Sequence, residues 1–175
     1  MNRSVQTENG ARHMARDATQ RAFLPAAATP HELSVPPTPR LHLVPGGTGR
    51  GVMDGGWWPR SRDTEAELTE LLTALARTDE GVGPAARVAI DFDDWEDIPL
   101  RITVLGCDVR VCWLAHLEHM VAITCGRADP ILLLVVPPAT RPSSAEAALA
   151  RSVIENGDVM SQEILASCDI STARV

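Results

Sequence analysis

The chain has 175 residues, of which 45% are hydrophobic and 22% are charged, and its formal net charge is −7. These values fit a single globular domain with tails, and the negative charge disfavours nucleic acid and anionic membranes as partners. The longest apolar run, residues 131–138, is too short to span a bilayer, and no apolar signal core follows the first arginines, so the expected compartment is the cytoplasm.

Cysteine usage argues against disulfides and bound metals. The four cysteines show no C-x-x-C spacing, and in a reducing compartment they are expected to be small buried apolar residues: Cys107, Cys112, Cys125 and Cys168. Cys107 and Cys112 fall on opposite faces of any single strand, which is poor geometry for joint ligation. We therefore expect no metal site at these cysteines. No cofactor is expected either.

Composition divides the chain into three parts. Residues 1–39 are rich in Ala, Pro, Thr and polar side chains without a sustained period, which predicts a disordered or loosely ordered arm. A single α+β domain is expected over residues 40–155. Residues 156–175 are expected to form a short, partly helical tail.

The domain begins with a predicted hairpin and a helix. Residues 41–44 form a short strand pattern that stops at a glycine cluster, and residues 51–58 are a second extended segment. Either Asp63 or Thr64 can cap the helix that follows. Its apolar stripe recurs at helical spacing, at Leu68, Leu71, Leu72 and Leu75.

Alternating apolar and polar residues then predict a series of short strands, as is typical of antiparallel sheet with one buried face. The uninterrupted apolar run at residues 131–136 is the candidate for a central strand covered on both faces. A second capping box, Ser143-x-x-Glu146, opens the last helix of the domain. The alternating strands fall near residues 88–92, 100–104, 109–113 and 121–125.

This order of elements predicts an α+β fold. The sheet is expected to be mostly antiparallel, with about five to seven short strands, and two helices are expected to pack on one face of it. A doubly wound parallel sheet is disfavoured because no consistent βαβαβ repeat is present.

Two motifs that resemble functional sites are better explained as turns. The glycine cluster at residues 46–51 leads into more extended chain and lacks the Gly-Lys-Ser/Thr ending of a phosphate loop, so a hairpin turn is favoured. His116 and His119 in the His-Leu-Glu-His segment have the spacing of two metal ligands on a helix, and Glu118 could polarise a bound water. The segment lies between two strand patterns with no obvious third ligand, which favours a solvated loop.

The acidic run at residues 91–97 is a stronger candidate. Asp91 and Asp93 are expected to share one face of a strand, where two close carboxylates could carry out acid/base chemistry or bind a divalent cation. A charged solvent face, or neutralisation by arginines of neighbouring elements, explains the same run. The structural explanation is favoured.

The functional and structural explanations are most evenly balanced for residues 57–63, the segment Trp-Trp-Pro-Arg-Ser-Arg-Asp. Arg60 and Arg62, followed by a helix N-terminus, would make an anion site, and the faces of Trp57 and Trp58 could stack a ring or cover an arginine. In the structural alternative, one tryptophan packs in the core and the other shields an arginine that pairs with Asp91 or Asp93. A structural role for these residues is favoured over a binding site.

These residues give the chain a resemblance to an actinobacterial family known only as domain-of-unknown-function family 5994. The resemblance covers roughly residues 40–153. The chain differs at His116-Leu117-Glu118-His119, where family members tend to have a polar stretch with glycine and serine, and its N-terminal arm falls outside the match. The family implies no activity, substrate or cofactor. The matching strings are Leu43-Val44-Pro45, Asp54-Gly55-Gly56-Trp57-Trp58-Pro59-Arg60-Ser61-Arg62-Asp63, Glu67-Leu68, the strand at residues 88–95, Arg101-Ile102 and Leu132-Leu133-Leu134-Val135-Val136-Pro137-Pro138.

Two functions follow as hypotheses. The preferred one is a non-enzymatic binding or regulatory module that contacts another protein or a small anionic ligand through residues 57–62 and the neighbouring acidic strand. The alternative is a small enzyme in which Asp91 or Asp93 is the acid/base and Arg60 and Arg62 hold an anionic substrate. We favour the first because the sequence offers no nucleophile–base pair and no metal set.

Overall fold

The structure of the protein is a computed structural model, which describes residues 39–46, 52–78, 83–126, 129–155, 157 and 159–172. These residues belong to one compact unit, Pro37–Val175. The expected N-terminal arm lies outside the described residues except for its last residue. None of the described helices has the length and apolar character needed to cross a bilayer.

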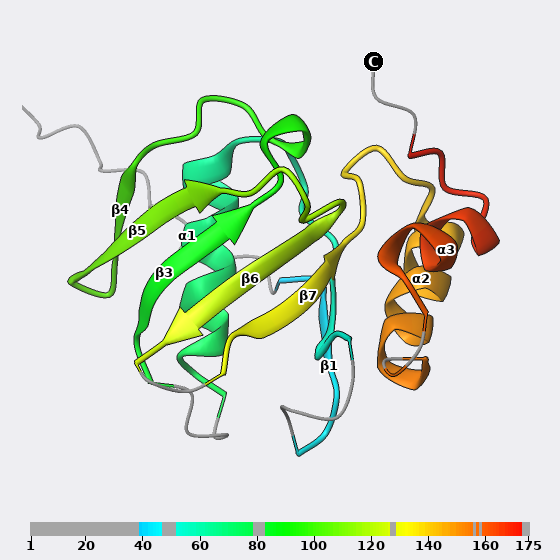
Figure 1. Cartoon of the computed structure of the whole chain (residues 1–175), viewed down its shortest axis with the longest axis horizontal. Coiled ribbons are helices and arrows are strands. Elements are labelled where there is room, and N and C mark those ends of the chain that lie inside the picture. The colour runs from blue at the N-terminus through cyan, green and yellow to red at the C-terminus, as the bar shows by residue number, and fades with distance from the viewer. Residues whose placement is uncertain are drawn as a thin grey trace, which may run out of the picture. The chain divides into compact units, whose positions relative to one another are not determined.

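A seven-stranded sheet forms the centre of this unit, with the spatial order β1-β2-β7-β6-β3-β5-β4 (Figure 1). The expected hairpin is confirmed, because β1 and β2 pair antiparallel. Every expected strand after the first helix is present. The strands are β1 (Leu41–Leu43), β2 (Gly55–Trp57), β3 (Ala85–Ile90), β4 (Arg101–Val104), β5 (Cys107–Trp113), β6 (Met120–Cys125) and β7 (Ile131–Val135).

The sheet is mixed, so the expectation of a mostly antiparallel sheet needs correction. Four neighbouring pairs are antiparallel, whereas β2 pairs with β7 and β3 pairs with β5 in parallel. Both parallel pairs join strands that are not consecutive in the chain. Apolar alternation decides which face of a strand is buried, but it does not encode the strand's neighbour, so the error was in the pairing and not in the strands.

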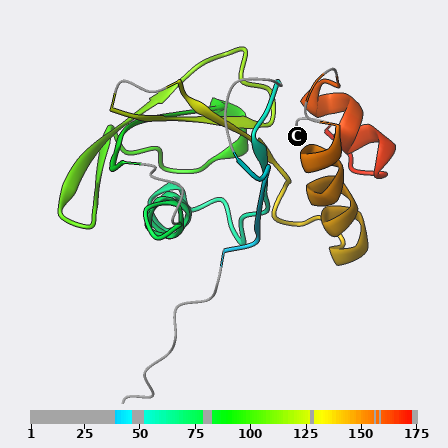
Figure 2. The same ribbon diagram turned by 90° about the horizontal axis from the view of Figure 1, so that it is seen from below.

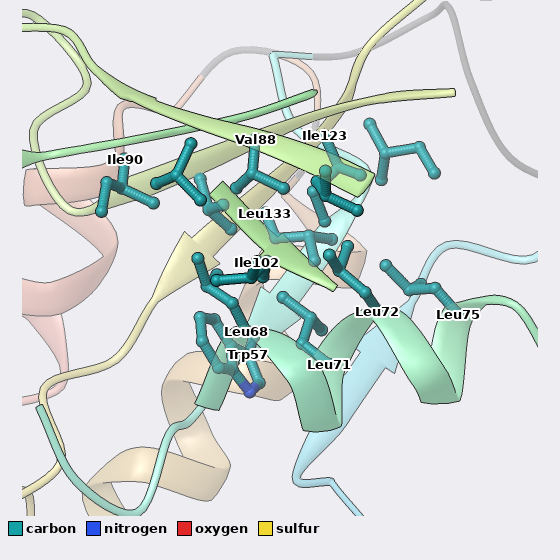
Figure 3. Packing of buried hydrophobic residues seen from close by; sticks show 14 of the residues in the cluster. Trp57, Leu68, Leu71, Leu72, Leu75, Val88, Ile90, Ile102, Ile123 and Leu133 are labelled. Atoms are coloured by element: carbon teal, nitrogen blue, oxygen red, sulfur yellow. The ribbon is translucent and has the colours of Figure 1, made fainter. Parts of the chain in front are cut away.

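Helix α1 (Thr64–Leu75) begins where its sequence predicts. The Asp63 carboxylate accepts a hydrogen bond from the Ala66 backbone N–H at 3.0 Å, which makes Asp63 the cap. All four leucines of the apolar stripe are buried, and Figure 3 shows them directed from α1 toward Val88, Ile123 and Leu133 of the sheet. Each buried leucine of this kind stabilises the fold by about 1.5–3 kcal/mol.

Helices α2 (Pro142–Ile154) and α3 (Ser161–Ser167) belong to a second cluster. Figure 2 shows α1 and the α2–α3 pair on opposite sides of the hairpin strands. The expectation that two helices pack on one face is therefore not confirmed. The capping box at Ser143 is also wrong, because α2 already begins at Pro142 and Arg141 makes no side-chain cap. Proline suits this first helical position, since its missing N–H would have no helical partner there.

Strand β7 connects the two clusters, as expected of a strand covered on both faces. Leu133 and Val135 belong to the cluster under α1, whereas Leu134 and Val136 belong to the cluster with α2 and α3. The second cluster also contains Ile164 and other side chains of and after α3, so the packed region extends beyond Glu155.

All four cysteines are free thiols, and their surroundings predict different reactivity. Cys107 is exposed, whereas burial raises the pKa of the partly buried Cys125 thiol. Because the thiolate is the reactive form, we expect iodoacetamide at pH 8 to modify Cys107 several-fold faster than Cys125. Peptide mass mapping over time measures both rates, and unfolding in urea should equalise them. Equal rates in the folded protein would contradict this prediction.

Candidate functional site

The two adjacent tryptophans serve different parts of the core. Trp57 is 2% exposed and stacks on Trp95, with ring centroids 5.3 Å apart and planes 18° from parallel. Trp58 is 6% exposed and belongs to the second cluster. Successive residues of a strand point to opposite faces, so the Trp-Trp pair supplies one ring to each cluster. Neither ring presents much surface to a ligand or partner.

Trp58 does cover an arginine, but that arginine is Arg40. The Arg40 guanidinium carbon lies 3.4 Å from the centre of the Trp58 ring, and Arg40 donates hydrogen bonds to the carbonyl oxygens of Trp58 and Pro59. Burial lowers the pKa of Arg40, and the neighbouring charge of Arg60 acts in the same direction. The hydrogen bonds and the aromatic ring keep this cation in place at the entry to the domain.

Arg60 and Arg62 bind to different elements. Arg60 lies 3.8 Å from the Glu70 carboxylate on α1. Arg62 donates through Nε to the Asp94 carbonyl oxygen at 3.1 Å and through Nη2 to the Asp93 carbonyl oxygen at 2.5 Å. Arg62 therefore holds the backbone of the acidic run.

The acidic residues lie on a turn, which corrects the expectation that Asp91 and Asp93 share a strand face. Strand β3 ends at Ile90, and Asp91 caps the short 3-10 helix η1 (Phe92–Asp94) by accepting from the Asp93 N–H at 3.3 Å. As a result Asp91 is buried and Asp93 is exposed. Apolar alternation through Phe92 suggested a longer strand, but that ring is 57% exposed.

The acidic turn, residues 91–97, is joined to the start of α1 by further contacts. Thr64 Oγ1 donates to the Glu96 carbonyl oxygen at 2.6 Å, and the Glu96 N–H donates to the Arg62 carbonyl oxygen at 3.0 Å. The Arg62 side chain also lies 3.8 Å from the Glu96 carboxylate. These contacts hold residues 62–64 and the acidic turn in one arrangement relative to each other.

A cavity of about 440 Å³ opens beside this turn. It lies where β2, β7 and β3 all end, because these strands run in the same direction, and where the antiparallel β6 begins. Chain segments distant in sequence meet here for that reason. The lining residues are Pro59, Arg62, Phe92, Asp93, Asp94, Trp95, His119, Val135, Pro137, Pro138, Ser171 and Thr172.

The wall of the cavity contains a close carboxylate–imidazole pair. Asp94 Oδ1 lies 3.1 Å from His119 Nδ1, and the two side chains are 17% and 8% exposed. The turn prediction for residues 116–119 is confirmed, but a solvated loop is wrong for His119, which is buried. Its φ of 51° directs the chain into β6, and its carbonyl oxygen accepts from the Val135 N–H at 2.8 Å. A non-glycine residue in this region of φ is uncommon and is often found at functional sites.

Two polar atoms of the lining residues are buried without a hydrogen-bond partner among the described residues: Asp94 Oδ2 and Trp95 Nε1. Trp95 is 6% exposed, so its indole N–H is removed from bulk water. Buried polar groups are nearly always hydrogen-bonded, and each exception costs about 1–3 kcal/mol. Both atoms are enclosed by neighbouring protein atoms, so they belong to the packed wall and are not presented to the cavity.

The structure brings two of the six expected site residues to the cavity. Arg62 and Asp93 line it, whereas Trp57, Trp58, Arg60 and Asp91 do not. The residues that sequence reasoning missed as a group are Asp94, Trp95 and His119. Asp94 was within the acidic run, but nothing in the local pattern connects it to a histidine that is 25 positions away. Within the described part of the chain, no three His, Cys, Asp or Glu side chains are grouped as they would be to hold a metal.

The fold and the site define a mixed-sheet α+β domain with a partly polar cavity where several strands end. The chain belongs to the family of unknown function DUF5994, whose model matches residues 40–152. Every lining residue of the cavity except Ser171 and Thr172 lies within the matched region. No curated protein and no solved structure matches the chain.

Proposed function

We propose that this protein is a non-enzymatic binding module that holds a small molecule in the cavity beside the acidic turn. The observation that carries the proposal is the cavity itself, with the buried Asp94–His119 pair and the Trp95 indole in its lining. A volume of about 440 Å³ is within the range of small-molecule sites. Proline and valine side chains supply apolar wall, and a few polar groups supply direction, which is the usual composition of such sites.

A small ligand is favoured over a protein partner bound through residues 57–62. Trp57 and Trp58, the largest side chains of that segment, are buried, and large exposed aromatic residues are what a protein interface normally uses. The four free thiols support a reducing compartment, and the cytoplasm remains part of the proposal.

The enzyme alternative loses its original residues. Asp91 is occupied as the cap of η1, Arg60 lies near Glu70, and Arg62 holds backbone carbonyl groups. The Asp94–His119 pair has the residue types of an acid/base pair. The lining also contains the hydroxyl groups of Ser171 and Thr172, so catalysis remains the second candidate. We favour binding because the cavity itself is the observation that carries the proposal.

A fragment library that spans anionic, neutral and cationic compounds tests the proposal on the full chain. We expect ligand-observed NMR to find compounds that bind wild type and that lose most of their binding in Thr172→Trp, because the large side chain occupies the cavity. Thr103→Trp is the matched control, since Thr103 is exposed on β4 and does not line the cavity. The proposal fails if no compound distinguishes Thr172→Trp from wild type.

A further inference from the structure

We propose that one face of the sheet is a docking surface for an acidic segment of a partner protein. The surface is a row of three arginines, called the arginine row: Arg101 on β4, Arg110 on β5 and Arg87 on β3. None of the three lines the cavity beside the acidic turn. The inference therefore goes beyond the proposed function and does not depend on it.

Strand pairing places the three arginines side by side. Arg101 is the direct partner of Arg110 across the antiparallel β4–β5 pair, and Arg110 is the direct partner of Arg87 across the parallel β3–β5 pair. Direct partners on neighbouring strands point to the same face of a sheet, and such strands lie about 4.8 Å apart. The arginine row therefore crosses three strands over about 10 Å.

The row lies on the face of the sheet that is turned away from α1. The residues next to the arginines along the three strands, Val88, Ile102 and Val109, are buried in the cluster under α1, so the arginines point to the other side. All three arginines are exposed. Figures 1 and 2 show α1 on one side of β3, β5 and β6 and no described helix over the other side.

The positive charge of the row is not neutralised within the described part of the chain. The three guanidinium groups make no hydrogen bond or ion pair with a described residue. Strands β3 to β6 contain one acidic residue, Asp108, and its carboxylate accepts a hydrogen bond from Thr103 Oγ1 at 3.4 Å. These strands therefore combine three positive charges with one negative charge, in a chain whose formal net charge is −7.

This arrangement is costly for the fold alone, because like charges directly opposite each other on neighbouring strands are destabilising. A charge on the edge strand β4 discourages pairing with another sheet, which accounts for Arg101. It does not account for Arg110 and Arg87, which lie on inner strands. Carboxylates supplied by a partner would offset the repulsion along the whole row.

An acidic protein segment fits the row better than nucleic acid or an anionic bilayer does. Carboxylates accept paired hydrogen bonds from guanidinium groups, and arginine clusters are a recurring means of recognising acidic motifs. Beside the row, Cys112, Ala89 and Ala122 are successive direct partners, so the neighbouring surface is low and apolar. No described residue of β3 to β6 presents an aromatic ring on this face for a base to stack on.

The extent of the row also favours a short segment. A bilayer or a long nucleic acid would meet much of the surface around the row, and the net charge of the chain repels such polyanions. A segment with a few carboxylates contacts the arginines alone.

Fluorescence anisotropy on the full chain tests the surface with two labelled peptides, Glu-Ala-Glu-Ala-Glu-Ala-Glu and its analogue with glutamine in place of glutamate. We expect wild type at low ionic strength to bind the glutamate peptide at least about tenfold tighter than the glutamine peptide. Added salt should weaken this binding, because it screens exposed charges. Arg110→Gln removes the centre of the row and should reduce affinity for the glutamate peptide by about tenfold.

Arg77→Gln is the matched control, because it removes the same charge from an exposed position just after α1 and should leave the affinity unchanged. Urea unfolding checks that the variants are folded, and Arg87→Gln takes the place of Arg110→Gln should the latter not fold. The inference is overturned if wild type binds both peptides equally, or if Arg110→Gln binds the glutamate peptide as tightly as Arg77→Gln does. It is also overturned if single-stranded oligouridylate or phosphatidylserine vesicles bind more tightly than the glutamate peptide with the same dependence on Arg110.

Discussion

Gly55→Ala should destabilise the domain by about 3 kcal/mol or more, one of the two largest effects that we expect from a single substitution. Gly55 has a φ of +149°, and a Cβ atom built on it lies 2.1 Å from the carbonyl oxygen of His42. That oxygen belongs to the backbone of the paired strand β1, so no side-chain rotation can relieve the clash. The substitution must separate β1 from β2. Urea denaturation followed by far-UV circular dichroism measures the loss.

Two other glycines separate the clash from general effects of alanine. Gly106 has a φ of +79° with open space around its Cβ position, so Gly106→Ala should show only the backbone strain, about 1 kcal/mol. Gly83 also faces open space and has an ordinary φ, so Gly83→Ala should change stability little. If Gly55→Ala lowers the free energy of unfolding no more than Gly106→Ala does, then β1 and β2 do not approach each other as closely at this point as the structure indicates.

Trp57→Ala should cost about 3–5 kcal/mol, because the ring is almost fully buried and stacks on Trp95. The substitution leaves a cavity under α1 and removes support from Trp95, which lines the cavity beside the acidic turn. Trp57→Phe should recover part of the loss, since a smaller ring still fills some of the space. The free energy of unfolding, again from urea denaturation, is the quantity to compare.

Trp113→Ala is the matched control, because Trp113 is 48% exposed at the end of β5. We expect this variant to lose about 1 kcal/mol, mainly from its contact with Phe92. Similar losses at both positions would mean that Trp57 is not a core residue. Trp57 would then again be a candidate for a ligand-binding residue at the surface.

Residues 57–63 show which side-chain contacts a local sequence pattern can predict and which it cannot. The sequence favoured a structural role for this segment. It also predicted that one tryptophan packs in the core and that the other covers an arginine. It assigned the wrong partners, since Trp58 covers Arg40 and Arg62 binds backbone carbonyl groups and Glu96. Residue type predicts the kind of contact that a side chain makes, but the partner is set by which strands become neighbours.

The sequence by itself determined the elements whose causes are local. These include α1, with its cap narrowed to Asp63 or Thr64, the β1–β2 hairpin and the approximate positions of β3 to β7, since apolar period, capping and turn chemistry act over a few residues. Tertiary structure alone decided the two parallel pairings, the assignment of α1 and α2 to different clusters, and the cavity. Asp94 and His119 meet because β3 and β6 are antiparallel neighbours, so the end of one strand lies beside the start of the other. The free energy that sets such neighbours is shared among buried contacts across the whole sheet, and no short segment contains it.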